Sequence, residues 1–222
     1  MKTMWTLLPG TVRATHWRPV AAGAASALAF VVIMMVVPVT LDVDGVTMVL
    51  RLAALLGAVG LAFLLDDPSE STTAVTPVAR RLRILLRPIM IAPVAAFWWS
   101  SLVLLLRAGV DREAWTSVPM TGITVEAAVL ALIGIAVAAL RVRRAPHDGG
   151  GILAAPTVIA LAVVGQLLPP RLAMFPSPGS SHWDQAHRVW IGLLPLAFGI
   201  LLWACRDLLG TRRRGARRFP RS

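Results

Sequence analysis

The sequence has very few of the side chains that carry covalent and redox chemistry. Its 222 residues include a single cysteine, Cys205, a single lysine, Lys2, and no tyrosine. One cysteine excludes an intramolecular disulfide, a CxxC redox pair and a cysteine zinc cluster. The absence of any lysine after position 2 excludes a Walker A phosphate loop, a retinal Schiff base and a pyridoxal site. The chain therefore cannot hydrolyse ATP by the Walker route.

Acidic residues are also scarce, whereas apolar residues and arginine are abundant. Hydrophobic residues make up 57% of the chain, and 22 Lys+Arg face only 11 Asp+Glu, which gives a net charge of +11. A fold of this length has too little interior to bury so many apolar side chains. We therefore expect most of them to lie in a lipid bilayer.

Apolar runs along the chain approach the length of about 20 residues that a helix needs to cross a bilayer. They predict an all-α polytopic membrane protein with six transmembrane helices, at about residues 20–39, 46–65, 88–106, 123–140, 152–168 and 189–205. Residues 1–19 would form a cytoplasmic or interfacial segment, and residues 206–222 a basic cytoplasmic tail. The fifth run is the shortest, and the second contains a charge, Arg51.

The positive charges are distributed unequally between the two sides of this arrangement. Seventeen cations fall on one side: Lys2, Arg13, Arg18, Arg80, Arg81, Arg83, Arg87, Arg141, Arg143, Arg144, Arg206, Arg212, Arg213, Arg214, Arg217, Arg218 and Arg221. Only four fall on the other: Arg107, Arg112, Arg171 and Arg188. The positive-inside rule then predicts a multi-pass plasma-membrane protein with both termini cytoplasmic.

The basic tail follows the last predicted span directly. Such clusters are usually membrane anchors that bind anionic lipid headgroups. A basic cluster can also bind nucleic acid, but we do not expect a nucleic-acid partner here.

The segment between the second and third spans has the pattern of a structured element. Asp67 suits a helix N-cap, Pro68 the first helical position, and Glu70 the carboxylate position of a capping box. The stretch 78–87 is amphipathic, with leucines on one face and arginines on the other. It predicts a cytoplasmic interfacial helix, which either binds lipid phosphates or docks a cytoplasmic partner.

The connection between the fifth and sixth spans is long, at residues 169–188. It carries Leu172, Met174, Phe175 and Trp183 in otherwise polar surroundings, which predicts a re-entrant-like segment on the outer side. The alternative is a disordered loop anchored by one tryptophan. In the same stretch His182, Asp184 and His187 are only a weak indication of a metal site, because no further histidine accompanies them on that side.

Three polar side chains lie at comparable depth inside predicted spans. They are Arg51, Glu126 and Gln166, and charges within spans are functional candidates because burying them is costly. Arg51 and Glu126 either form a pair or extend separately to the headgroups. A guanidinium–carboxylate pair with no base, nucleophile or metal beside it does not make an active site. We therefore expect no catalytic residues and no cofactor in this chain.

The layout and one short motif resemble a known family. The motif comprises Leu64-Leu65-Asp66-Asp67-Pro68, Ser71-Thr72-Thr73, Thr76-Pro77 and Arg80-Arg81-Leu82-Arg83. Together with six spans and cytoplasmic termini, it is similar to membrane-spanning permease subunits of type 2 ATP-binding-cassette exporters, in particular small actinobacterial ones. The N-terminal segment departs from this family, because it is short and interrupted by Pro9-Gly10.

The resemblance implies a membrane subunit of an ATP-driven exporter. Its ATPase would be a separate subunit, and a second membrane subunit, the same chain or a different one, would complete the pathway. The surface that contacts the ATPase would comprise Asp67, Glu70, Arg80, Arg81 and Arg83. Arg51, Glu126 and Gln166 would form or support an outer polar gate, and the alternative for the Arg51–Glu126 pair is a structural clasp between helices. The alternative is a non-transporting membrane protein with an assembly or regulatory role.

Overall fold

The computed structural model describes residues 17–38, 40–66, 80–144, 149–169 and 171–205, with the backbone alone for 80–85. Within these residues the chain forms helices and no strands. They are α2 (Trp17–Val36), α3 (Val43–Ala62), α5 (Arg80–Gly109), α6 (Arg112–Thr116), α7 (Met120–Arg144), α8 (Gly151–Leu167) and α9 (Trp183–Ala204).

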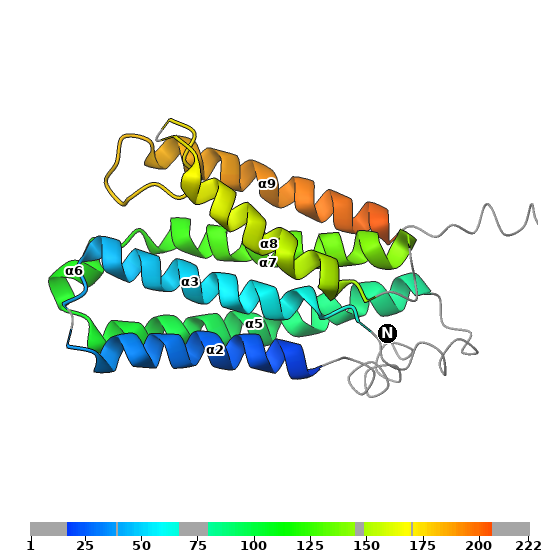
Figure 1. The fold of residues 1–222 in the computed structure, drawn as a ribbon, viewed down its shortest axis with the longest axis horizontal. Coiled ribbons are helices and arrows are strands. Elements are labelled where there is room, and N and C mark those ends of the chain that lie inside the picture. Colours follow the sequence, from blue (N-terminus) through cyan, green and yellow to red (C-terminus); the bar gives the residue numbers. More distant parts are fainter. Residues whose placement is uncertain (1–16, 39, 67–79, 145–148, 170, 206–222) are drawn as a thin grey trace, which may run out of the picture.

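The long helices lie side by side and run up and down along one axis (Figure 1). The start of α2 and the end of α9 lie at the same end of the bundle, which we call the termini end. Helix α6 and the α8–α9 connection lie at the opposite end, which we call the loop end. The up-and-down path agrees with the topology that the sequence predicts.

Each predicted span corresponds to a helix, and five of these helices are long and apolar enough to cross a membrane. These five are α2, α3, α7, α9 and the part of α5 from Leu86 to Gly109. Helix α8, with 17 residues, is apolar but shorter. The all-helical, membrane-type fold is therefore confirmed, while six crossings stay a prediction.

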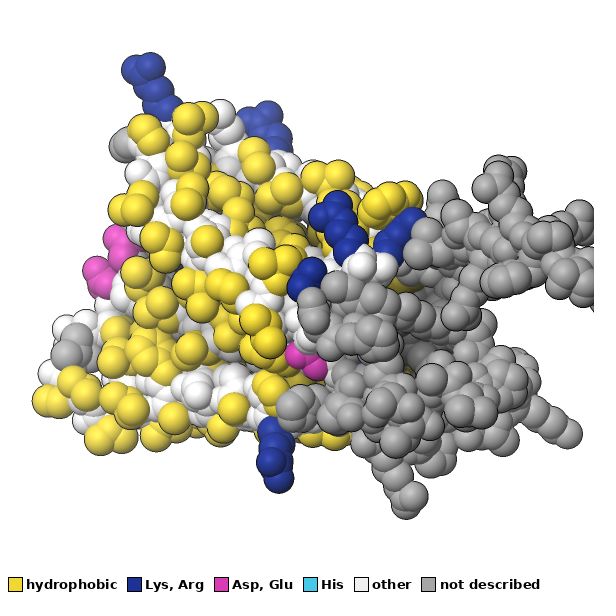
Figure 2. Space-filling view, turned by 45° about the vertical axis from the view of Figure 1, so that its right-hand side comes forward, with side chains coloured by type: hydrophobic (Ala, Val, Ile, Leu, Met, Phe, Trp, Pro, Cys, Tyr) yellow, Lys and Arg dark blue, Asp and Glu magenta, His cyan; other side chains and the backbone are white. Residues whose placement is uncertain are grey.

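The apolar character of the surface supports a membrane environment. Hydrophobic side chains cover much of the face in Figure 2. Among the exposed ones are Phe97 on α5, Ile152 on α8 and Phe198 on α9. A water-soluble monomer rarely exposes a continuous apolar surface of this extent.

The predicted interfacial helix and the predicted third span are parts of one continuous helix. Helix α5 runs without a break from Arg80 through Pro88 and Pro93 to Gly109. A proline inside a helix removes one backbone hydrogen bond, but the leucines and arginines before Pro88 favour helix strongly enough to continue it. Residues 80–87 of the expected interfacial helix belong to α5, and residues 78 and 79 lie outside the described part of the chain.

Helices α3 and α7 have the largest buried shares and form the centre of the bundle. Helix α2 packs on α3 through glycine, and a Cβ atom added at Gly23 would lie 2.7 Å from Gly60 Cα and 2.7 Å from the Leu56 carbonyl oxygen. These are backbone atoms, so the two helices approach as closely as glycine alone permits. In a membrane there is no hydrophobic driving force between helices, and close packing at small residues of this kind brings them together.

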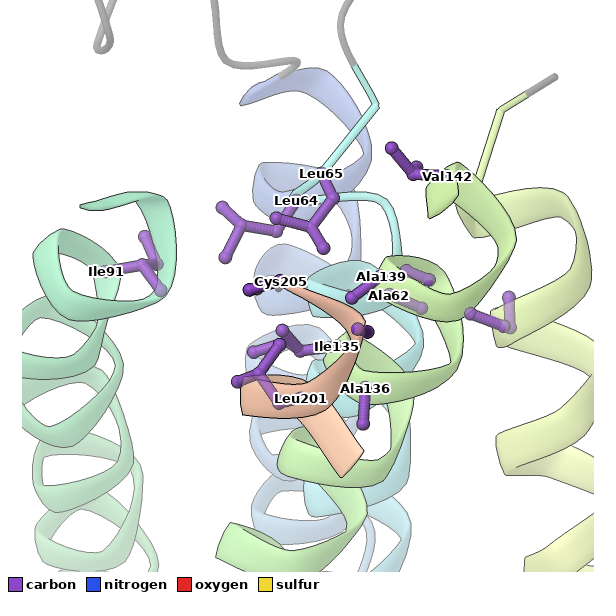
Figure 3. Packing of buried hydrophobic residues seen from close by; sticks show 14 residues of the cluster. Ala62, Leu64, Leu65, Ile91, Ile135, Ala136, Ala139, Val142, Leu201 and Cys205 are labelled. Carbon is purple, nitrogen blue, oxygen red and sulfur yellow. The ribbon is translucent and has the colours of Figure 1, made fainter. Parts of the chain in front are cut away.

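Small and branched apolar side chains fill the termini end of the bundle (Figure 3). We call this set the inner apolar cluster; it comprises Ala62, Leu64, Leu65, Ile91, Ile135, Ala136, Ala138, Ala139, Val142, Ala154, Ala155, Leu201, Ala204 and Cys205. It joins α3, α5, α7, α8 and α9 without a charged side chain among its members.

Candidate functional site

Arg51 and Glu126 form a bidentate ion pair inside the bundle, which is one of the two arrangements that the sequence left open. Arg51 Nε donates to Glu126 Oε2 at 2.7 Å, and Nη2 donates to Oε1 at 2.8 Å. The side chain of Arg51 is 11% exposed and that of Glu126 only 1%. Parallel guanidinium–carboxylate bonds are among the strongest in proteins and fix the relative orientation of both groups. The pair therefore joins the two central helices, α3 and α7.

The remaining hydrogen bonds of Arg51 reach the connection between α8 and α9. Nη1 donates to the carbonyl oxygen of Phe175 at 3.2 Å, and Nη2 to that of Pro176 at 3.0 Å. The guanidinium carbon also lies 5.3 Å from the centre of the Phe175 ring, within cation–π range. One arginine thus binds both the buried carboxylate and the loop above it.

Residues 174–176, which we call the closing segment, are also bonded to α8 and α9. The Met174 amide donates to the Gly165 carbonyl at 3.3 Å, and the indole Nε1 of Trp190 donates to the Met174 carbonyl at 2.7 Å. Trp190 is fully buried, and its ring lies 5.2 Å from that of Phe175. The closing segment is therefore packed onto the bundle, and its apolar side chains contact protein at the loop end.

His187 on α9 is the third ionisable side chain of the site. Its Nε2 lies 3.1 Å from Glu126 Oε1, and its Nδ1 lies 2.9 Å from the Trp183 carbonyl oxygen. Its ring stacks on that of Trp183, with centres 4.1 Å apart. Gly122 makes room for the imidazole, because a Cβ atom there would lie 2.5 Å from Nε2. The site thus comprises Arg51, Glu126 and His187 from three helices, covered by the closing segment.

Sequence reasoning placed two of these three groups correctly and missed the third. The sequence suggested His187 only as a weak metal ligand, together with His182 and Asp184. In the part of the chain that the structure describes, no group of three or more His, Cys, Asp or Glu side chains is arranged to hold a metal ion. The signal that was missed is the spacing of Trp183, His187 and Trp190, which places them on one face of a helix.

Among the other predicted site residues, only Gln166 has a described side chain, and it is not part of this cluster. Gln166 belongs to α8 but its side chain is exposed. Arg80, Arg81 and Arg83 belong to the start of α5, where only the backbone is described. Asp67 and Glu70 lie outside the described residues, as does the predicted helix cap that they would form.

Polar contacts of another kind occur at the termini end, close to the predicted partner surface. Asp66 Oδ1 accepts from the Gly151 amide at 3.0 Å, at the first residue of α8. Arg87 Nη1 donates to the Leu65 carbonyl at 3.0 Å. The turn after α3 is therefore bonded to both α5 and α8.

The chemistry available to the Arg51–Glu126–His187 cluster is charge pairing and proton binding. A buried ion pair gains from its own attraction about what it loses in hydration, so its net stabilisation is small. Removing one partner is nevertheless costly, because the other charge stays buried. Such a cluster is suited to specify one arrangement of helices and loop.

Comparison of the chain with protein-family models, curated proteins and solved structures finds no match. Evidence for its function therefore comes from its own geometry and charge distribution.

Proposed function

We propose that this chain is the membrane-spanning subunit of an ATP-driven exporter and works with a separate ATPase subunit. In this proposal all six long helices, α8 included, cross the plasma membrane, and the termini end faces the cytoplasm. The closing segment then forms a re-entrant-like cover on the outer side. A second membrane subunit, the same chain or a different one, would complete the pathway, and anionic lipids would bind the arginine-rich side.

The observation that carries the proposal is the buried Arg51–Glu126 pair under the closing segment. Ionisable side chains inside a helical membrane bundle are rare, and they commonly mark the pathway of a transported substrate or ion. Arg51 of this pair bonds the α8–α9 connection at the loop end, opposite the end that holds most of the described arginines. A closed polar layer on one side and a basic, partner-binding side on the other are what an exporter subunit requires.

The start of α5 supports a mechanical link between the two sides. Arg80, Arg81 and Arg83 are continuous with the helix that would cross the membrane, without an intervening loop. A force on these residues would therefore act along α5. The bonds of Arg87 to Leu65 and of Asp66 to Gly151 would pass it to α3 and α8. The proposal keeps the predicted ATPase contact, which comprises Asp67, Glu70 and the three arginines.

The proposal is tested by charge reversal on the predicted contact surface. The full chain carrying Arg80→Glu and Arg83→Glu, purified by an affinity tag from its native membrane, should lose the ATPase activity that accompanies the parent chain. Arg112→Glu is the matched control, since it reverses an exposed arginine at the loop end. ATPase activity retained by the double variant would refute the contact, and its absence from the parent preparation would refute the exporter.

The completeness of the Arg51 contacts favours a second candidate, a non-transporting assembly or regulatory subunit. Arg51 makes four hydrogen bonds and Glu126 is almost fully buried, as a permanent clasp would require. Arg51→Ala and Glu126→Ala separate the two roles. Loss of export with normal complex yield indicates a gate, whereas normal export with reduced yield indicates a clasp.

A further inference from the structure

Whether the contact between Glu126 and His187 is attractive depends on which ring nitrogens of the imidazole carry a proton. A carbonyl oxygen can only accept, so the 2.9 Å contact with Trp183 places a proton on Nδ1 of His187. In the neutral ring Nε2 then has a lone pair and no proton. This lone pair would lie 3.1 Å from a carboxylate oxygen, and Nε2 is buried and forms no hydrogen bond to any described residue. Two acceptors repel each other at this distance, whereas a protonated Nε2 attracts the carboxylate.

We propose that Glu126 and His187 form a proton-binding site, and that the bound proton keeps the closing segment on the bundle. The proton moves between Nε2 of the imidazole and bulk water, with no other group exchanged. This inference concerns the chain itself and is independent of the exporter role and of an ATPase partner.

Charges around the site are consistent with a protonated imidazole. Arg51 and Glu126 face His187 from α3 and α7, so the carboxylate is shared by two cationic groups. The closing segment contributes only the carbonyl oxygens of Phe175 and Pro176. On α9 the flanking Asp184 and Arg188 are exposed. Glu126 is therefore the negative charge that stabilises the proton.

Trp183 adds a second favourable contact for the charged ring. Its indole stacks on the imidazole at 4.1 Å and lies 5.6 Å from the Arg51 guanidinium carbon. The π-face of tryptophan attracts cations, and more strongly where water is excluded. Protonated His187 thus has attractive neighbours in both Glu126 and Trp183.

The same helix face connects the proton to the closing segment. Trp183, His187 and Trp190 follow at spacings of four and three residues, so they share one side of α9. Trp190 bonds the Met174 carbonyl, and Trp183 lies beside Arg51, which bonds the next two carbonyls. When the proton leaves, repulsion between Nε2 and Oε1 separates α9 from α7. This loosens the bond of Trp190 and the bonds of Arg51 to the closing segment.

The chain offers a labelling test, because Cys205 is its only cysteine. In a Cys205→Ala background, a cysteine is introduced at position 176, which is buried, or at the adjacent position 177, which is exposed. Each full-length protein is placed in phosphatidylcholine vesicles and treated with a water-soluble maleimide at about pH 5.5 and about pH 8.5, which bracket the usual range of histidine. Dividing the labelling rate at position 176 by the rate at the exposed position 177 corrects for the change in thiolate fraction with pH.

The labelling rate at position 176 relative to position 177 should rise about tenfold or more at the higher pH. A one-proton equilibrium can change by up to about tenfold per pH unit, and the closed form binds the extra proton. The relative rate should become independent of pH in His187→Gln, which removes the imidazole and keeps both partners of the Arg51–Glu126 pair.

A pH dependence that persists in His187→Gln would overturn the proposal, as would a parent protein with no pH dependence. Hydrogen exchange of the peptide around residues 172–178 in the unsubstituted chain provides a second measurement. After scaling for the intrinsic exchange rate, its protection should fall at the higher pH in the parent and not in His187→Gln. Equal behaviour of the two chains would again refute the proton site.

Discussion

The two ends of the bundle are stabilised in different ways. At the loop end, hydrogen bonds that Arg51 and Trp190 donate join three helices and the closing segment, in addition to an apolar cluster that includes Val46, Leu106 and Ile123. At the termini end, the inner apolar cluster joins five helices through alanine, leucine, isoleucine and valine side chains. The few polar bonds there, such as that of Asp66 to Gly151, connect neighbouring turns and helix ends.

The bonds at each end indicate which end can change its arrangement in a switch-like way. Apolar packing tolerates substitutions that keep the side-chain volume. Its contacts are also non-directional, so they do not depend on the orientation of single groups as hydrogen bonds do. Charged hydrogen bonds are lost within a short displacement, and each loss leaves a buried group without a partner. The loop end is therefore expected to have discrete closed and open forms, whereas the termini end is expected to stay packed.

The largest expected effect on stability follows from removing one charge at the loop end. Glu126→Ala leaves Arg51 buried without its carboxylate, which should destabilise the protein by about 3–5 kcal/mol. Unfolding of the purified chain in detergent, by heat or denaturant, measures the loss.

Two further variants sharpen this result. Gln166→Ala changes a polar side chain that is exposed on α8, so it should leave stability nearly unchanged. The double variant Arg51→Met/Glu126→Leu removes both charges together and should be more stable than Glu126→Ala. A double variant as unstable as the single one would show that packing, and not the unpaired charge, causes the loss.

An intermediate effect is expected at the close approach of α2 and α3 toward the termini end. Gly23→Ala places a methyl group 2.7 Å from backbone atoms of Gly60 and Leu56, so the helices must separate. Overpacking of this kind costs about 1–3 kcal/mol. Gly199→Ala on α9 is the control, because nothing lies within 4 Å of the added atom. Equal stability of the two variants would contradict the described α2–α3 contact.

The smallest effect is expected at the polar contact that precedes α8. Asp66→Ala removes the acceptor for the Gly151 amide and should cost about 1 kcal/mol, as the loss of a helix cap does. Asp66→Asn keeps an oxygen at that position and should cost less. An Asp66→Ala penalty as large as that of Glu126→Ala would remove the distinction drawn between the two ends.

Apolar run length predicted the helices well because a bilayer imposes one length on every crossing. The Arg51–Glu126 pair was also predictable, since two opposite charges at similar depth in membrane helices gain by meeting. The continuity of α5 through Pro88 was not predictable, because proline usually ends a helix in water. The roles of Phe175 and Pro176 were not predictable either, since their hydrogen bonds with Arg51 use backbone carbonyls, which every residue has.

Those backbone contacts have a consequence for how the protein can evolve. Arg51 recognises the path of the main chain at positions 175 and 176, and the hydrogen bonds would be the same for other side chains that keep this path. The exposed neighbours of the closing segment, such as Ser177, are then free to diversify among related proteins. Surface chemistry at this end could thus be retuned by mutation while the anchoring of the loop is inherited unchanged.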